Sequence, residues 1–510
     1  MKKNHLLYSI LFGMLAVLLF LPMAQEHLGL FTTQPLNGVM MGTKAPQVTL
    51  QNYVSGQMQS QTEHYISEHF GFREPVIRLY NQYVWDFYRK TYVNSIVIGK
   101  DRWLYGKEFT DDCLGERWKE YANSPEQLRE RCLNEAKRIR KVQEILAEYD
   151  KHLFVIMEPG KTRTYPEHLP QSIVTAAAAK PNILCAADLY PVLFDSLGVN
   201  CLNIDRWFMN AKDTVDFMLY PQTGTHWSNL AALYATDSII RTMEKLSDKN
   251  LNNLEISSIR FDTTMKPDID MEQLLNVCRT VRDLPNQYAR FKVDHDSTAI
   301  KPAWIHIGDS YFWNIAYHIP LNDIFAYHHY WYYNSTIYYD EKHHSTADID
   351  LVQELITADF ITLGYCTSQI YALSSYFSAQ ALVRLCYSQK EVNQVVQGIV
   401  DNMNRSEEWK ASLQKKADVQ GKPLEAVMRS DALYMLFLDP EHYFPELATE
   451  HPKPRNPMLR QCLPDDPFGR VLRNMYNDPH WMEVLKQKAE TQQVDLETVM
   501  IQDAAWMLQQ

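Results

Sequence analysis

The chain lacks two features that would place it in common classes of binding protein. It has no run of Lys and Arg long enough to follow a phosphate backbone, and its formal net charge is −12, so nucleic acid is not an expected partner. None of its eight cysteines forms a Cys-x-x-Cys pair, which argues against a zinc ribbon or a thioredoxin-like site. The chain has 510 residues, of which 46% are hydrophobic and 22% charged. This length and composition predict a globular protein with two or three folded units.

The first thirty residues contain an apolar run suited to a membrane. Lys2 and Lys3 precede the run from Leu6 to Leu21, and Glu26 follows it. The length fits a signal peptide or a short anchor, and the charges keep the N-terminus inside while the body is exported. Because no small-x-small cleavage site follows, we expect residues 1–25 to stay as a signal anchor. An even number of cysteines in an exported chain permits disulfides, with Cys113–Cys132 and Cys185–Cys201 nearest in sequence, although free buried thiols fit equally.

The remaining chain divides into three expected regions. Residues 26–110 form a spacer, a helix and a β-hairpin that lead into the core. Residues 111–395 alternate short apolar runs with helical patterns, which favours an α/β fold with a parallel sheet covered by helices. The expected helices are 125–150, 186–197 and 230–246, and the expected strands are 152–157, 199–204, 304–307 and 360–364.

Residues 396–510 contain an internal repeat. Met403, Trp409 and Leu413 recur 72 positions later, and so do further residues up to Leu436, with no gap. Each copy of about forty residues fits two amphipathic helices joined by a polar turn, a duplicated helical hairpin. Two copies rarely form a stable solenoid alone, so we expect a role in packing or partner docking.

The strongest chemical signal is a hydrophobic run, 304–307, that ends in Gly308-Asp309-Ser310. In an open α/β sheet, residues just past the carboxyl end of a strand face the ligand crevice. There, Ser310 could present its hydroxyl to a substrate while its backbone N–H stabilises an oxyanion. Alternatively, Ser310 merely caps a helix.

The second signal is His226, which lies with Trp227 in a loop before an expected helix. A lone His is more often structural. Combined with a Gly-Asp-Ser at the end of a strand, however, His226 is a candidate general base, provided that the fold brings it to Ser310.

Together these segments resemble the alginate O-acetyltransferases of the AlgX/AlgJ type, a permuted branch of the SGNH (GDSL) hydrolase superfamily. In that branch the His-Trp motif precedes the Gly-Asp-Ser motif, as it does here. The similarity covers roughly residues 50–390, including Gly71-Phe72-Arg73, the hairpin around Gly99 and Glu158-Pro159-Gly160. It implies an SGNH-like sheet, Ser310 as nucleophile, His226 as general base and a single-pass protein of the bacterial inner membrane, its body in the periplasm or outside the cell.

One departure from that family concerns the third catalytic residue. The family usually has an Asp two residues before the His, where this chain has Gly224. A triad needs a group that holds the imidazole tautomer. Asp205, just past the expected strand 199–204, is the candidate substitute, and a Ser-His dyad or a weak site is the alternative.

Four further residues complete the expected oxyanion and substrate contacts, namely Gly308, Asp309, Lys161 and Trp227. Lys161 could steady an acyl or uronate carboxylate, or it could be a solvated loop charge. The aromatic run 327–333 could stack on sugar faces or pack in the core. His343 and His344, with Asp340 and Glu341 nearby, lack helical ligand spacing, so no metal and no cofactor are expected.

The leading hypothesis is therefore an O-acetyltransferase acting on an exported polysaccharide or cell-wall glycan, with a membrane-bound O-acyltransferase as a possible partner that supplies acyl groups. A carbohydrate acetyl esterase would use the same acyl-enzyme with water as acceptor. A non-catalytic glycan-binding or assembly protein with a degenerate site is the third hypothesis, kept open by Gly224.

Overall fold

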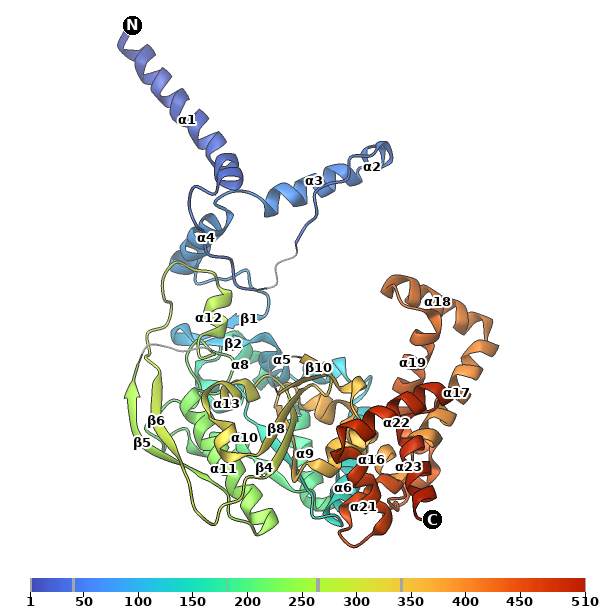
Figure 1. The fold of residues 1–510 in the computed structure, drawn as a ribbon. Coiled ribbons are helices and arrows are strands. Elements are labelled where there is room, and N and C mark those ends of the chain that lie inside the picture. Colours follow the sequence, from blue (N-terminus) through green and yellow to red (C-terminus); the bar gives the residue numbers. More distant parts are fainter. Residues whose placement is uncertain (1, 39–41, 181, 263–266, 340–342, 510) are drawn as a thin grey trace.

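The N-terminal helix stands apart from the rest of the molecule in the computed structural model, which describes residues 2–38, 42–180, 182–262, 267–339 and 343–509 (Figure 1). Helix α1 (Lys2–Leu28) is the one described helix that is long and apolar enough to cross a membrane, and its most apolar stretch is not buried. Its position agrees with the expected anchor, and the membrane crossing itself stays a prediction.

The end of α1 lies against the start of α4 (Arg73–Tyr88). A Cβ atom on Gly71 would lie 2.0 Å from the carbonyl oxygen of Pro22, so only glycine allows this approach. Helices α2 (Leu50–Val54) and α3 (Gln57–Glu68) project from this junction (Figure 1). The predicted hairpin follows as β1 (Ile96–Ile98) and β2 (Leu104–Gly106), which pair antiparallel.

A seven-stranded sheet forms the centre of the molecule, in the order β10-β9-β8-β7-β11-β3-β4. The strands from β8 to β4 run parallel, whereas β9 is antiparallel to both of its neighbours. This confirms the predicted α/β class. The bounds are β3 (His152–Glu158), β4 (Cys201–Asn203), β7 (Ala303–Gly308), β8 (Tyr327–Tyr332), β9 (Thr336–Tyr338), β10 (His343–Ser345) and β11 (Phe360–Cys366).

Helices cover both faces of this sheet. Alternate residues of β3 belong to different cores: Leu153, Val155 and Met157 to one, Phe154 and Ile156 to the other. Burial on both faces explains why the strand reads as a continuous apolar run. The first core includes α6 (Pro125–Ala147), α9 (Ala186–Leu197), α15 (Leu351–Thr357) and α16 (Phe377–Cys386); the second includes α10 (Ile204–Ala211), α11 (Asn229–Ser247), α13 (Phe312–His318) and α14 (Leu321–Ile324).

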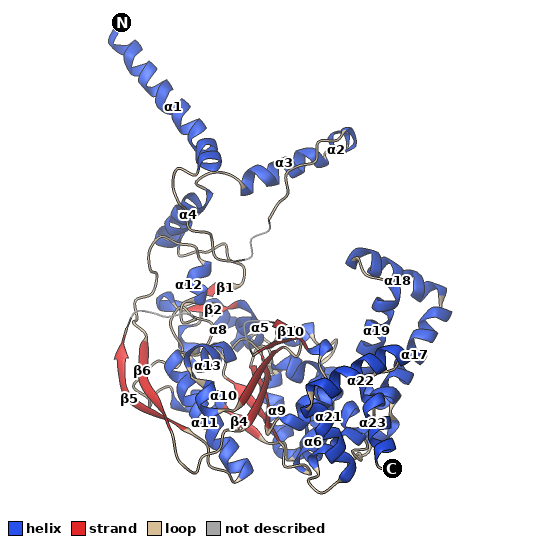
Figure 2. Ribbon diagram, viewed as in Figure 1, coloured by secondary structure: helices blue, strands red, loops and turns tan. Residues whose placement is uncertain are grey.

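A separate antiparallel pair, β5 (Asn253–Phe261) and β6 (Gln287–Asp294), was not expected from the sequence. It stands apart from the central sheet (Figure 2) and packs on α11. Most side chains of β5 are exposed, so its residues lack the apolar pattern that reveals a buried strand. Short helices complete the region: α5 (Lys107–Cys113), α7 (Lys161–Thr164), α8 (Gln171–Ala178) and α12 (Asp270–Leu274).

The C-terminal region is helical. Each copy of the repeat contains two helices joined by a turn, and one further helix precedes each pair, so that each unit has three helices. The first contains α17 (Gln389–Arg405), α18 (Glu407–Gln420) and α19 (Leu424–Leu438), and the second contains α21 (Pro467–Asn477), α22 (Pro479–Gln492) and α23 (Leu496–Met507), with α20 (Pro440–Tyr443) between them. Helix α22 begins and ends 72 positions after α18. Equivalent ion pairs, Lys416–Asp431 and Lys488–Asp503, link the last two helices of each unit.

All eight cysteines are free thiols, so neither of the sequence-adjacent pairs is bonded. Cys132 is buried, and burial raises the pKa of its thiol to about 11. Cys185 is also buried and lies 3.4 Å from the carbonyl oxygen of Asp112. Such protonated, buried thiols are structural rather than reactive.

Candidate active site

Ser310 and His226 meet at the carboxyl edge of the sheet. Strand β7 ends at Gly308, and Ser310 follows two residues later, before α13. Its Oγ lies 2.8 Å from Nε2 of His226, which comes from a loop 84 residues earlier. Ser310 is half-buried, and the His226 side chain is 13% exposed, so the pair is not sealed from solvent. The structure thus brings together the two residues singled out from the sequence.

Buried neighbours fix the position of His226. Trp227 is fully buried, and its indole N–H donates to the carbonyl oxygen of Tyr311, 3.1 Å away. Ser228 caps α11 by accepting the N–H of Ala231. His226 therefore lies between an anchored ring and a helix start. Trp227 itself is a positioning residue and not the substrate contact expected from the sequence.

The carboxylate beside His226 belongs to Asp270, the first residue of α12. Its Oδ2 lies 3.0 Å from Nδ1 of His226, away from the line of a straight hydrogen bond. Its Oδ1 accepts the backbone N–H groups of Thr225 and Met271, each at 2.7 Å. Asp270 thus ties the histidine loop to α12 and supplies a negative charge at the imidazole.

Asp205, the substitute expected from the sequence, is engaged elsewhere. It is buried at the start of α10, where Oδ2 forms an ion pair with Arg163 at 2.9 Å and Oδ1 accepts the N–H of Gly160. A buried carboxylate requires such a partner. The structure therefore places Asp270, and not Asp205, next to Nδ1.

Gly224 has no room for the carboxylate that the AlgX/AlgJ type usually carries there. A Cβ atom would lie 2.5 Å from Cγ of Pro221 and 2.8 Å from the carbonyl oxygen of Asp268. The segment that leads into α12 occupies this space. The missing carboxylate is thus replaced by one from a different part of the chain. The sequence offers one weak signal for it, the acidic start of α12 in Asp268-Ile269-Asp270.

Lys161 is neither a substrate contact nor a solvated loop charge. Its side chain is 1% exposed, and Nζ donates to the carbonyl oxygens of Pro221, Gln222 and Gly224 at 2.7–3.1 Å. Burial lowers the pKa of Lys161, whereas three acceptors match the three N–H donors of an ammonium group. Lys161 therefore holds the loop that carries His226.

Asp309 and Gly308 also shape the site from within. Asp309 is buried; Oδ1 accepts the N–H of Tyr311 at 3.0 Å and Oδ2 accepts the N–H of Cys366 at 2.8 Å. A Cβ atom on Gly308 would lie 2.3 Å from the carbonyl oxygen of Gly364, so glycine allows the strands to approach. Both residues fix the turn that presents Ser310. The Asp309 carboxylate is used up by backbone N–H groups and is therefore not a substrate contact.

Carboxylates around the imidazole determine its charge. Burial favours neutral His226, but Asp270 first, and then Asp309 and Asp268, raise its pKa above the ordinary value. Asp268 is itself buried, and this raises its pKa to about 7. Glu158 is the last residue of β3. Burial and the neighbouring Asp309 raise the pKa of Glu158 well above its usual range, which favours its protonated form.

The aromatic run forms β8, with Tyr330 and Trp331 buried in opposite cores. The Tyr330 hydroxyl donates to the carbonyl oxygen of Asp309, so this ring supports the turn below Ser310. Among the described residues, no group of three His, Cys, Asp or Glu side chains is placed to hold a metal. Asp340 and Glu341 lie outside the described residues.

Residues 96–307 match the family described as "SGNH hydrolase-like domain, acetyltransferase AlgX". This part of the chain is similar to the AlgX-type SGNH hydrolase-like domain, and the match covers less than half of the 510 residues. The match includes His226 and Asp270, and it ends three residues before Ser310. The resemblance seen in the sequence motifs is thereby confirmed for the domain. No curated protein matches the chain.

Solved structures similar to the SGNH domain include the O-acetyltransferase domain of Pseudomonas putida AlgJ, at 15% identity and a TM-score of 0.33, covering 54% of this chain and 92% of that one. Pseudomonas aeruginosa AlgX is 13% identical with a TM-score of 0.34, covering 56% and 65%. Bacillus cereus PatB1 with a sulfonyl adduct is 12% identical with a TM-score of 0.34, covering 54% and 97%. The family assignment rests on the family match.

Proposed function

We propose that the protein is an O-acetyltransferase that acts on an exported polysaccharide or cell-wall glycan through Ser310, His226 and Asp270. The observation that carries this proposal is the 2.8 Å contact between Ser310 Oγ and His226 Nε2 at the carboxyl edge of an AlgX-type domain. A nucleophile within hydrogen-bond reach of its base, and a carboxylate beside that base, is the arrangement that acyl transfer requires.

The first half-reaction forms an acetyl-enzyme. Neutral His226 takes the proton of Ser310 at Nε2 while Oγ attacks the carbonyl carbon of an acetyl donor. The tetrahedral intermediate collapses when the bond to the leaving group breaks, and the leaving group receives the proton from His226. The backbone N–H of Ser310 is positioned by the turn at Asp309 to stabilise the oxyanion.

The second half-reaction transfers the acetyl group to a sugar. His226 takes the proton of a sugar hydroxyl, whose oxygen attacks the acetyl-enzyme, and Ser310 leaves as a hydroxyl with that proton. Asp270 favours the tautomer with the proton on Nδ1, which leaves Nε2 free to accept, and it stabilises the imidazolium that forms in both halves.

The N-terminal helix supports a location at a membrane. Under this proposal α1 anchors the chain with its body outside the cytoplasm, because the flanking charges favour that orientation. Acetyl groups from cytoplasmic metabolism would then have to cross the membrane. A membrane-bound O-acyltransferase is the proposed partner that supplies them.

The test is turnover of a small acetyl ester by the full-length protein, with and without an oligosaccharide acceptor. Transfer to the sugar, lost in both Ser310→Ala and His226→Ala, supports the proposal; Ser228→Ala, at the neighbouring helix cap, controls for damage to the loop. Release of acetate to water regardless of acceptor would make the protein an esterase. Glycan binding without any turnover in the wild type would make it a scaffold.

A further inference from the structure

A cavity of about 670 Å³ lies where the helical units meet the SGNH domain. Its wall contains residues from five segments, which lie within 346–351, 376–384, 389–393, 429–437 and 495–497. It therefore joins the start of α15, helix α16, both helical units and the edge of the sheet. Clefts of this size between structural units are common ligand sites.

Part of the cavity wall lies at the same edge of the sheet as Ser310. Strand β10 is parallel to β8, because both are antiparallel to β9, so residues 346–351 leave the sheet at its carboxyl edge. Helix α16 follows the carboxyl end of β11. A short chain of contacts links the two places: the N–H of Tyr333 donates to Gly308, and Nδ2 of Asn334 donates to Gln380 in the cavity wall, each at 2.9 Å.

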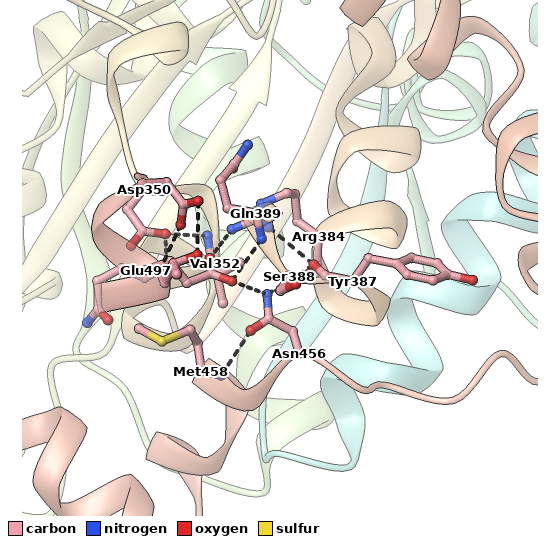
Figure 3. Close-up of polar contacts among 12 residues, drawn as sticks. Asp350, Val352, Arg384, Tyr387, Ser388, Gln389, Asn456, Met458 and Glu497 are labelled. Carbon is pink, nitrogen blue, oxygen red and sulfur yellow. Dashed lines mark hydrogen bonds and ion pairs between the residues drawn. The ribbon is translucent and has the colours of Figure 1, made fainter. Parts of the chain in front are cut away.

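The floor of the cavity is a closed polar network (Figure 3). Arg384 forms a buried ion pair with Glu497, and Oε1 of Glu497 accepts the N–H of Gln389 at 3.0 Å. Asn456 donates to the carbonyl oxygen of Arg384 at 2.8 Å. A satisfied network in a low-dielectric interior is rigid, so the cavity is preformed.

The rim carries two exposed aromatic rings. Tyr376 is 38% exposed and Tyr434 is 53% exposed, and their rings meet edge to face with centroids 5.7 Å apart. Tyr376 comes from the SGNH domain and Tyr434 from α19. Aromatic rings with polar tips provide flat apolar surfaces on which the faces of sugar rings can stack.

The backbone is strained at this rim. Ser374, Ser375 and Tyr376 are three successive non-glycine residues with positive φ, at 62°, 45° and 68°. Ser374 donates to Glu135, and the carbonyl oxygen of Ser375 accepts Nδ2 of Asn334 at 3.1 Å. Strain of this kind persists only where the surroundings enforce it, and it concentrates at ligand clamps. Here it holds the Tyr376 ring at the cavity.

The charges of the wall select against an acidic ligand. Of its two guanidinium groups, Arg384 is paired with Glu497, whereas Arg429 donates to the neutral Oδ1 of Asn393 at 2.7 Å and keeps its positive charge. Four carboxylates also line the cavity: Asp348, Asp350, Asp495 and Glu497. Three amides add donors and acceptors suited to hydroxyl groups: Gln380, Gln389 and Asn393.

We infer that this cavity binds a segment of an uncharged glycan, stacked on Tyr434 and Tyr376, at a subsite separate from Ser310. Aromatic rings, amides and a net negative wall fit sugars that carry hydroxyl groups and no carboxylates. The binding of this glycan is independent of the proposed function. Only its further role as the acetyl acceptor rests on the proposed function.

The test measures binding of hexasaccharides to the full-length protein by calorimetry. The probes are β-1,4-, β-1,3- and α-1,4-linked glucose hexamers and a hexamer of β-1,4-linked mannuronate. At least one glucose hexamer is expected to bind more tightly than the uronate. Tyr434→Ala is expected to weaken that binding about tenfold, which equals about 1.4 kcal/mol. Trp506→Ala is the matched control, because Trp506 occupies the equivalent position in the second unit, is 59% exposed and lies outside the cavity wall.

Three results would overturn the inference: no glucose hexamer binds, the uronate binds more tightly, or Tyr434→Ala and Tyr376→Ala bind as the wild type does. The catalytic proposal is tested separately. Ser310→Ala should retain binding, and Tyr434→Ala should retain turnover of a small acetyl ester while the KM for a hexasaccharide acceptor rises. If the wild-type protein shows no ester turnover, the catalytic proposal is refuted, and the binding result is unaffected.

Discussion

Two polar clusters in this molecule differ in how completely their groups are paired. Around Arg384 and Glu497, the charged groups are buried and bonded to each other and to backbone groups. At Ser310 and His226, one hydroxyl remains half-exposed and Nδ1 has only an obliquely placed carboxylate beside it. A closed cluster fixes how parts of the chain pack, whereas an incompletely paired one retains capacity for a substrate.

The strongest way to sharpen this comparison is to change Asp270 to Asn. The side chain keeps its shape but loses the charge at His226, so acetyl transfer should fall about 10²- to 10⁴-fold. Steady-state kinetics with a small ester would measure kcat. Asp205→Asn is a control for loss of stability, because Asp205 pairs with Arg163 instead; an equal fall of kcat in a folded Asp205→Asn protein would contradict the assignment of Asp270.

Removing a carboxylate from the closed cluster should affect stability instead. Glu497→Ala leaves Arg384 buried without its partner and should lower the free energy of unfolding by about 3–5 kcal/mol. The matched control is Glu425→Ala, at the equivalent position of the first helical unit, where the side chain is exposed. Denaturant unfolding should show no measurable change for this control, and similar losses in both variants would refute the comparison.

Lys161 shares features with both clusters. It is buried and all three of its N–H donors are hydrogen-bonded, as in the Arg384–Glu497 cluster, but its acceptors lie in the loop that carries His226. Lys161→Met removes three hydrogen bonds to carbonyl oxygens while keeping the length of the side chain. Displacement of the loop should lower kcat about 10- to 100-fold. The surface variant Lys180→Met should keep the wild-type kcat. Unchanged activity in Lys161→Met would mean that the loop holds His226 without this clamp.

The smallest expected effect is on pH dependence. His226 must be neutral to accept a proton, so the rate of acetyl-enzyme formation should rise with pH. Because its pKa is raised by Asp270, the midpoint should lie above about 6.5, the ordinary value for His. Asp270→Asn should move the midpoint to lower pH. A midpoint that rises or stays in place in this variant would contradict the cause assigned to the raised pKa.

The sequence predicts those parts of the fold that depend on local pattern. Helix α9 has the predicted bounds, and β3, β7 and β11 are the apolar runs expected to form the sheet. Asp270 could not be predicted, because it meets His226 only after α12 packs against the loop at Gly224. The role of Lys161 was missed for a similar reason, since its acceptors lie 60 or more residues away.

Because Gly71 lies against Pro22, the chain that leaves α1 at Leu28 is back beside the end of α1 when α4 begins. If α1 crosses a membrane, as proposed, the distance from that membrane to Ser310 does not depend on the length of the segment between α1 and Gly71. The contact between Pro22 and Gly71 determines that distance instead, so changes in the length of the intervening segment should leave it unchanged.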